Sequence, residues 1–153
     1  MTRLKLAVIF LILLCGCSHF SKNSGNKNDT VSLRDSVRDG GYFVIVYFDT
    51  MSSDLKVDSA DTLMRVATLK SVSKTDVYLS GHADKTGEKK LNMELSRSRA
   101  EAVKNYLTGL GVSEADIFAE YYGDDRPAES GNTPEAYAKN RRVEITLKNR
   151  APQ

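Results

Sequence analysis

Strand-type and helix-type sequence patterns alternate from Tyr42 onward, and this alternation constrains the fold more than any other feature. The continuous apolar run at residues 43–48 predicts a central strand that is buried on both faces. Helix-type periodicity follows through Leu69, with Asp58 or Ser59 as the residue that caps the helix. The chain therefore enters its folded region as a strand followed by a helix.

The alternation continues along the chain. Further elements are expected as a strand at 77–79 that ends at Gly81, a long helix at 88–110 that stops at Gly109 or Gly111, a strand at 117–122, a short helix from Pro134 through Ala138, and a strand at 143–147. The order βαβαβ(α)β predicts an α/β fold, an α+β sandwich. In it, one mixed four-stranded sheet carries its helices on one face.

The long helix places a cation on its apolar side. At about 100° per residue, five apolar residues lie within about 60° of Arg99; they are Leu95, Ala102, Val103, Tyr106 and Leu110. Asn92 shares this stripe. Because a buried guanidinium without a partner costs several kcal/mol, three interpretations are open. Arg99 forms an internal ion pair, extends to the rim of the core, or binds a ligand.

Residues 1–16 have the organisation of an export signal. Arg3 and Lys5 form a positive start, and residues 6–14 form an apolar run that is too short to span a bilayer. A transmembrane anchor or a buried core helix is the alternative. It is disfavoured because polar sequence follows at once and a core helix needs an amphipathic pattern.

Both cysteines lie at the end of this signal. A disulfide between Cys15 and Cys17 would close a strained loop. The sequence Leu14-Cys15-Gly16-Cys17 instead resembles the bacterial lipobox, which implies removal of residues 1–16 and lipidation of Cys17 by acyl chains such as palmitate. Cys15 is the alternative acceptor. Ser18, in a position where Asp favours the inner membrane, implies the outer membrane, with the domain in the periplasm.

Charge and composition exclude several function classes. Removing Arg3 and Lys5 from the 22 basic residues leaves as many as the 20 acidic residues, which gives no support for nucleic-acid binding. The 2 histidines do not make a metal site, and we expect no cofactor. Residues 17–41, rich in Ser, Asn, Gly and Asp, are expected to be the lipidated N-terminus and a flexible tether. The domain is expected at 42–150.

A set of short motifs is spread over residues 42–148. They are 46–49, Gly81-His82-Ala83-Asp84, Gly87, Asn92, Leu95-Ser96, Arg99-Ala100, Val103, Tyr122-Gly123, Pro127 and 138–144. In residue type and spacing they resemble the OmpA-like peptidoglycan-binding domain family, and with the lipobox they resemble its Pal-like peptidoglycan-associated lipoproteins. The resemblance implies a non-covalent anchor between the outer membrane and the cell wall.

The resemblance also implies a binding site for diaminopimelate, a residue of the peptidoglycan stem peptide. Arg99 would bind its carboxylate through a bidentate fork, and Asp84 would bind its ammonium group. The pocket would be completed by Asn92, Leu95, Phe48, Asp49 and Arg142. Arg142 is preferred to Arg141 because the strand alternates from there, and His82 is expected to support the loop. We expect a solvent-reached pocket, so that Arg99→Leu changes stability by about 1 kcal/mol or less.

Two other functions are considered. A scaffold subunit of a secretion or conjugation machine would bind mainly proteins through the same fold. Residues 50–55 differ from the corresponding loop of the Tol-associated members, which leaves a Tol-type or a secretion-system partner open. Residues 84–87, Asp-Lys-Thr-Gly, also resemble the phosphorylation motif of P-type ATPases, but the chain has too little sequence for nucleotide-binding domains. We therefore expect that the protein is not an enzyme.

Overall fold

The computed structural model describes residues 41–149. In chain order the elements are β1 (Tyr42–Tyr47), α1 (Ser59–Val72), β2 (Thr75–Gly81), α2 (Lys89–Gly109), the 3-10 turn η1 (Glu114–Asp116), β3 (Ile117–Tyr121), α3 (Pro134–Asn140) and β4 (Arg142–Asn149). The expected elements are all present, with ends that differ by a few residues. The turn η1 was not expected.

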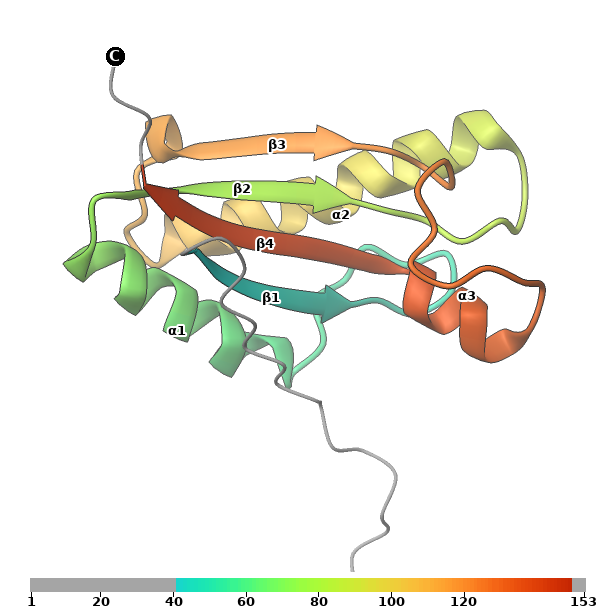
Figure 1. Cartoon of the computed structure of the whole chain (residues 1–153), viewed down its shortest axis with the longest axis horizontal. Helices are drawn as coiled ribbons and strands as arrows, with labels where there is room; N and C mark the ends of the chain where they lie inside the picture. Colours follow the sequence, from blue (N-terminus) through green and yellow to red (C-terminus); the bar gives the residue numbers. More distant parts are fainter. Residues whose placement is uncertain (1–40, 150–153) are drawn as a thin grey trace, which may run out of the picture. The chain divides into compact units, whose positions relative to one another are not determined.

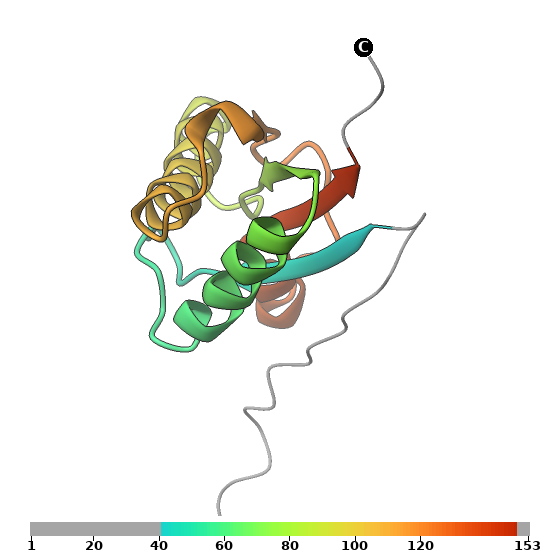
Figure 2. The same ribbon diagram turned by 90° about the vertical axis from the view of Figure 1, so that its left-hand side faces the viewer.

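The strands form one mixed sheet in the order β1-β4-β2-β3. Strand β4 is antiparallel to both of its neighbours, while β2 and β3 are parallel. Helices α1 and α2 lie on the same face of this sheet, and α3 lies where β4 begins (Figures 1 and 2). The predicted fold class is therefore confirmed.

The N-terminal predictions lie outside the described residues. They concern the signal at 1–16, lipidation at Cys17 and the tether at 17–41. The domain boundary at residue 42 likewise stays a prediction. Within residues 41–149, no helix has both the length and the apolar character needed to cross a membrane.

Alternate residues of the strands build the core. On β4 the core residues are Val143, Ile145 and Leu147, which are at most 2% exposed. The register places Ile145 between Val44 of β1 and Leu79 of β2, so the same alternation continues across the sheet. The helices complete the core with Leu63, Val66, Val103 and Leu107. The period of two along β4 thus fixes which face of the sheet the helices cover.

Strand β1 is not the central strand that its apolar run predicts. It pairs with β4 alone and forms an edge of the sheet, and Tyr47 is 41% exposed. The prediction was wrong because an apolar run does not distinguish a buried central strand from an edge strand whose second face carries aromatic side chains. The central strands are β4 and β2.

Helix α2 buries a stripe slightly rotated from the expected one. The buried residues are Asn92, Ser96, Arg99, Ala100, Val103 and Leu107. Leu95 and Tyr106 are only partly buried, and Leu110 lies beyond the helix with 41% of its surface exposed. The chain leaves the helix through Gly111, whose φ of 92° is in the left-handed region that glycine accepts readily. Arg99 is thus near the middle of the buried face.

Glycines allow α2 to approach the ends of β2 and β3 closely. A Cβ atom at Gly81 would lie 2.2 Å from the Ser96 carbonyl oxygen. The Ser96 hydroxyl accepts a hydrogen bond from the Gly123 N–H at 3.0 Å. Gly123 in turn has a φ of 53° and lies against the backbone of Met93. These contacts place the first half of α2 over the carboxyl ends of the two parallel strands.

We predict that Gly81→Ala destabilises the protein by about 1–3 kcal/mol or more, because the new methyl group collides with helix backbone that cannot move independently. Gly109→Ala is the matched control. Nothing lies within 4 Å of the added methyl group there, so we expect stabilisation by about 0.5–1 kcal/mol. Urea unfolding of both variants measures the difference. Equal midpoints for the two variants would contradict this packing.

Candidate functional site

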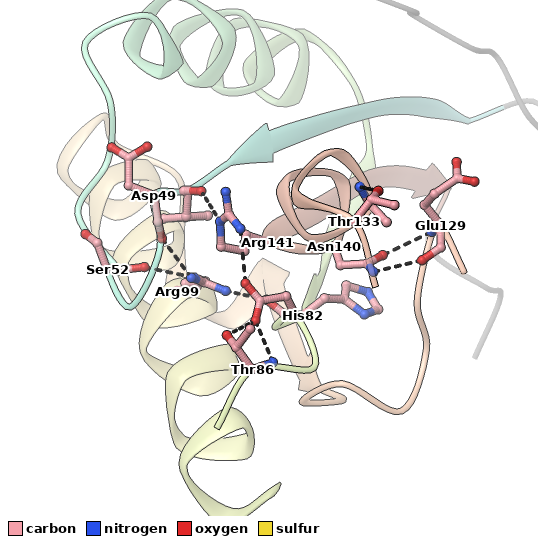
Figure 3. A network of polar contacts seen from close by, with 12 residues as sticks. Asp49, Ser52, His82, Thr86, Arg99, Glu129, Thr133, Asn140 and Arg141 are labelled. Atoms are coloured by element: carbon pink, nitrogen blue, oxygen red, sulfur yellow. Dashed lines mark hydrogen bonds and ion pairs between the residues drawn. The ribbon is translucent and has the colours of Figure 1, made fainter. Parts of the chain in front are cut away.

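The guanidinium of Arg99 is held by three backbone carbonyls. Nε donates to the carbonyl of Ser52 at 2.9 Å, Nη1 to that of His82 at 2.9 Å and Nη2 to that of Asp49 at 3.1 Å (Figure 3). The Phe48 ring lies 5.4 Å from the guanidinium carbon. One side chain from α2 therefore fastens the loops that follow β1 and β2.

This environment rejects two interpretations of Arg99, the internal ion pair and the extension to the rim of the core. Its partners are backbone carbonyls rather than a carboxylate, and its exposed fraction is 0%. The expectation that Arg99 is solvent-reached was therefore wrong. Burial lowers the pKa of Arg99 to about 10, Asp84 opposes this shift and Arg141 adds to it. The side chain is still a cation at neutral pH. A helical pattern predicts that Arg99 is buried, but it does not reveal carbonyls from distant loops.

The carboxylate of Asp84 forms an ion pair with Arg141. The distance from Asp84 Oδ2 to Arg141 Nη1 is 3.1 Å, and these side chains are 6% and 15% exposed. Asp84 Oδ1 accepts hydrogen bonds from the backbone N–H of Thr86 at 2.8 Å and from its hydroxyl. Burial alone would raise the pKa of Asp84, but the hydrogen bonds from Thr86 and Arg141 lower it below its usual value. Asp84 is thus ionised although it is buried.

The centre of this site has more positive than negative charge. Arg99 and Arg141 both act on the single carboxylate of Asp84. The Asp49 carboxylate is 74% exposed and pairs with Lys56 at 2.7 Å, so it contributes little screening to the buried cations. A buried excess of guanidinium favours an incoming anion, and a carboxylate matches the planar guanidinium fork.

Several other predicted site residues lie on the same loop after β1 and on the same helix. Phe48 is 2% exposed under Arg99, and Asp49 contributes its carbonyl. Asn92 is 3% exposed, and its Nδ2 has no hydrogen-bond partner within residues 41–149. Leu95 lies one turn further along α2 and is half-buried. The structure thus brings together the loop after β1, the loop after β2 and the first half of α2.

Arg142 lies elsewhere. It is buried, as expected, but its Nε and Nη2 bind Glu144 Oε1 at 2.8 and 2.7 Å, and Nη2 also donates to the Arg126 carbonyl at 3.3 Å. The arginine that contacts Asp84 is Arg141, which corrects the preference for Arg142. Because Val143 faces the helices, alternation turns Arg142 to the opposite face of the sheet. Arg141 precedes the strand, so alternation does not apply to it.

Arg141 is positioned by groups that sequence reasoning missed. Its Nε donates to the Phe48 carbonyl at 3.2 Å. Beside it, Asn140 accepts from the backbone N–H groups of Ala128 and Glu129 and donates to the Glu129 carbonyl (Figure 3). Asn140 therefore ties the end of α3 to the loop before it. The contact between Asp84 and Thr86 could have been predicted, because the two residues are close in the sequence. Nothing in the sequence indicated that the Ser52 carbonyl binds Arg99.

A metal site is not supported by the part of the chain that is described. Residues 41–149 contain no group of three or more His, Cys, Asp or Glu side chains placed to hold a metal ion.

In a comparison with known protein families, residues 47–141 match the model of the OmpA family. The chain is 45% identical over 103 residues to the Probable lipoprotein YiaD of Escherichia coli, covering 67% of this chain and 47% of that protein. It thus spans about half the length of that relative. It is 35% identical over 126 residues to the Peptidoglycan-associated lipoprotein of Pseudomonas putida, covering 82% of this chain and 74% of the relative.

Solved structures show the same fold. The peptidoglycan-associated lipoprotein from Burkholderia pseudomallei aligns with a TM-score of 0.65 and 31% identity, over 68% of this chain and 89% of that one. The cell wall anchor of the T6SS from Pseudomonas aeruginosa aligns with a TM-score of 0.62 and 26% identity, over 72% of this chain and 82% of that one.

We predict that Arg99→Leu destabilises the protein by about 2–5 kcal/mol, because it leaves three buried carbonyls unpaired and releases both loops. Arg97→Leu is the matched control, since Arg97 is exposed on the same helix and lies over the Tyr121 ring at 4.8 Å. We expect it to change stability by about 0.5 kcal/mol or less. Denaturant midpoints of the two variants decide this, and equal values would mean that Arg99 is not a structural residue.

Proposed function

The chain belongs to the OmpA family, and from this we propose that it is an outer-membrane lipoprotein that anchors the membrane non-covalently to peptidoglycan. The contact is with the diaminopimelate residue of the stem peptide. The observation that carries the proposal is the buried Asp84–Arg141 ion pair with the Arg99 cation beside it. The names of the relatives, peptidoglycan-associated lipoproteins among them, support it.

Binding proceeds by exchange of partners within the Asp84–Arg141 pair. The side-chain end of diaminopimelate carries an ammonium and a carboxylate. The ammonium replaces Arg141 at Asp84 Oδ2, and the carboxylate replaces Asp84 at the guanidinium of Arg141. Movement of Arg141, which is 15% exposed, opens the way to Arg99 beneath it. Asp84 and Arg141 each keep an opposite charge, so the exchange leaves neither partner of the pair alone.

The neighbouring residues complete the pocket. The donor Nδ2 of Asn92 supplies a hydrogen bond to the ligand, since it has no partner among the described residues. Leu95 and Phe48 form its apolar wall beside Arg99. Asp49 holds Arg99 through its carbonyl and leaves its exposed carboxylate at the rim. Arg142 does not contact the ligand. It lies on the other face of the sheet, where its charge acts on His82.

The proposed anchor is the lipid on Cys17, after removal of residues 1–16, with residues 17–41 as the tether and the domain from residue 42 in the periplasm. The lipobox and Ser18 support this arrangement. Attached acyl chains bind membranes with about 0.8 kcal/mol per buried methylene group. The protein partner of the anchor is a Tol-type or a secretion-system component.

We predict that mass spectrometry of the mature N-terminus finds acylated Cys17. The physical reason is that the apolar run at 6–14 directs export and the lipobox presents Cys17 to the acylating enzymes. Cys17→Ser is expected to release the protein from the membrane fraction. Acylated Cys15, or an unmodified Cys17, would contradict the assignment.

We predict that the full chain in mild detergent co-sediments with diaminopimelate-type sacculi and that Asp84→Asn weakens this about 100-fold. Loss of one partner from a desolvated charge contact costs about 2–5 kcal/mol of binding free energy. Asp125→Asn is the control, since it removes an exposed carboxylate that pairs with Lys89 at the surface, and it should bind like the wild type.

Sacculi with Lys in place of diaminopimelate supply the ammonium but not the carboxylate. When the Lys ammonium binds Asp84, Arg141 is left without an opposite charge. We therefore expect them to bind the wild type weakly. Equal sedimentation with both wall types would refute the partner exchange, and no sedimentation with either would refute wall binding itself.

A further inference from the structure

The imidazole of His82 lies in a buried cluster on the face of the sheet opposite Arg99. His82 is 2% exposed, and its ring stacks on Tyr122 with 5.3 Å between centroids. Figure 3 shows the ring pointing away from Arg99. Neither ring nitrogen has a hydrogen-bond partner among residues 41–149. Burial of a polar ring without hydrogen-bond partners costs free energy, so its presence here calls for an explanation.

The groups that face this ring disfavour a positive charge on it. From β4 come Arg142 and Glu144, and the Arg126 guanidinium lies over the Tyr122 ring at 3.8 Å. The Glu144 Oε1 atom is 4.0 Å from His82 Nε2, but both Nε and Nη2 of Arg142 already bind it. A protonated imidazole would therefore be a third cation beside one carboxylate. Burial, then the charges of Arg142 and Arg126, lower the pKa of His82 to about 4, while the charge of Glu144 opposes the shift.

The backbone of the same residue belongs to the candidate site. The His82 carbonyl accepts the hydrogen bond from Arg99 Nη1 at 2.9 Å, and the His82 N–H donates to the Arg142 carbonyl at 2.9 Å. Asp84 follows two residues later. The buried ring is thus attached to the backbone that holds Arg99 and that begins the loop carrying Asp84.

We propose that His82 is a positioning residue that keeps the wall-binding site assembled only while its imidazole is neutral, so that acid loosens the wall contact. The proposal rests on the proposed function. On protonation, the imidazolium gains a partner by taking Glu144 from Arg142 or by swinging out toward water. Either movement loosens the packing that fixes the His82 backbone, so that its carbonyl no longer holds Arg99. Asp84 stays ionised meanwhile, because its pKa is below the usual carboxyl range.

The direction of the pH effect follows from the two protonation equilibria. The buried imidazole has a pKa of about 4 and the freed one about 6.5. Neutral His82 is thus favoured in the assembled site, and this contribution is complete above pH 6.5 and decreases as the pH falls toward 4. At pH 4.5 the equilibrium between assembled and displaced forms shifts by about two orders of magnitude toward the displaced form.

The test compares the wild-type full chain with His82→Phe, which keeps a ring against Tyr122 but cannot be protonated. Co-sedimentation with diaminopimelate-type sacculi is measured from pH 7.5 to 4.5, with circular dichroism on the same samples. Each protein is compared with its own affinity at pH 7.5. At pH 4.5 we expect the folded wild type to lose about tenfold or more in affinity, while His82→Phe loses much less.

A parallel decline of the two proteins with pH, or a wild type that binds equally at both ends, would overturn the role of His82 and leave wall binding intact. If neither protein binds at pH 7.5, the proposed function fails instead. Nuclear magnetic resonance of the wild type gives a second readout that needs no variant. The Arg99 Nε–H signal should change with the same pH midpoint as the His82 ring signals. An Arg99 signal that stays constant while the His82 ring titrates would also overturn the proposal.

Discussion

The hydrogen bonds from Arg99 to three backbone carbonyls are the interaction on which the rest of the site depends. They join α2 to the Asp49–Ser52 turn and to His82, which lie in loops far apart in the sequence. A cation buried to 0% exposure is tolerated because these carbonyls replace its water and the ionised Asp84 lies in its field. In return, two loops without regular structure gain fixed positions, and these loops carry the proposed ligand contacts.

Several residues of the family-like motifs have packing roles that do not involve a ligand. Gly81 admits the backbone of Ser96, the Ser96 hydroxyl binds the Gly123 N–H, and Asn140 fastens the loop before α3. A pattern of this kind therefore specifies the fold and its site together. The close approach of α2 to β2 is what places Arg99 within reach of the His82 carbonyl.

The sequence was sufficient for local structure and insufficient for pairing. Periodicity predicted the helices and the inward position of Arg99, because both depend on neighbours a few residues away. It failed for β1, whose edge position depends on which strands pair, and for the choice between Arg141 and Arg142. Arg141 reaches Asp84 because α3 ends one residue before it and aims it across the sheet end. No local rule contains that geometry.

The Asp84–Arg141 pair is well suited to exchange because a buried ion pair contributes little net stability while either partner alone is costly. The pair keeps the site folded without fixing it rigidly, since the attraction is largely cancelled by lost hydration. In the proposed exchange, a zwitterion restores an opposite charge to each partner and adds a contact for the Asn92 donor. A ligand with a single charge would pair with one of the two residues and leave the other without an opposite charge. The proposed selectivity therefore follows from the requirement that neither partner of the buried pair is left alone.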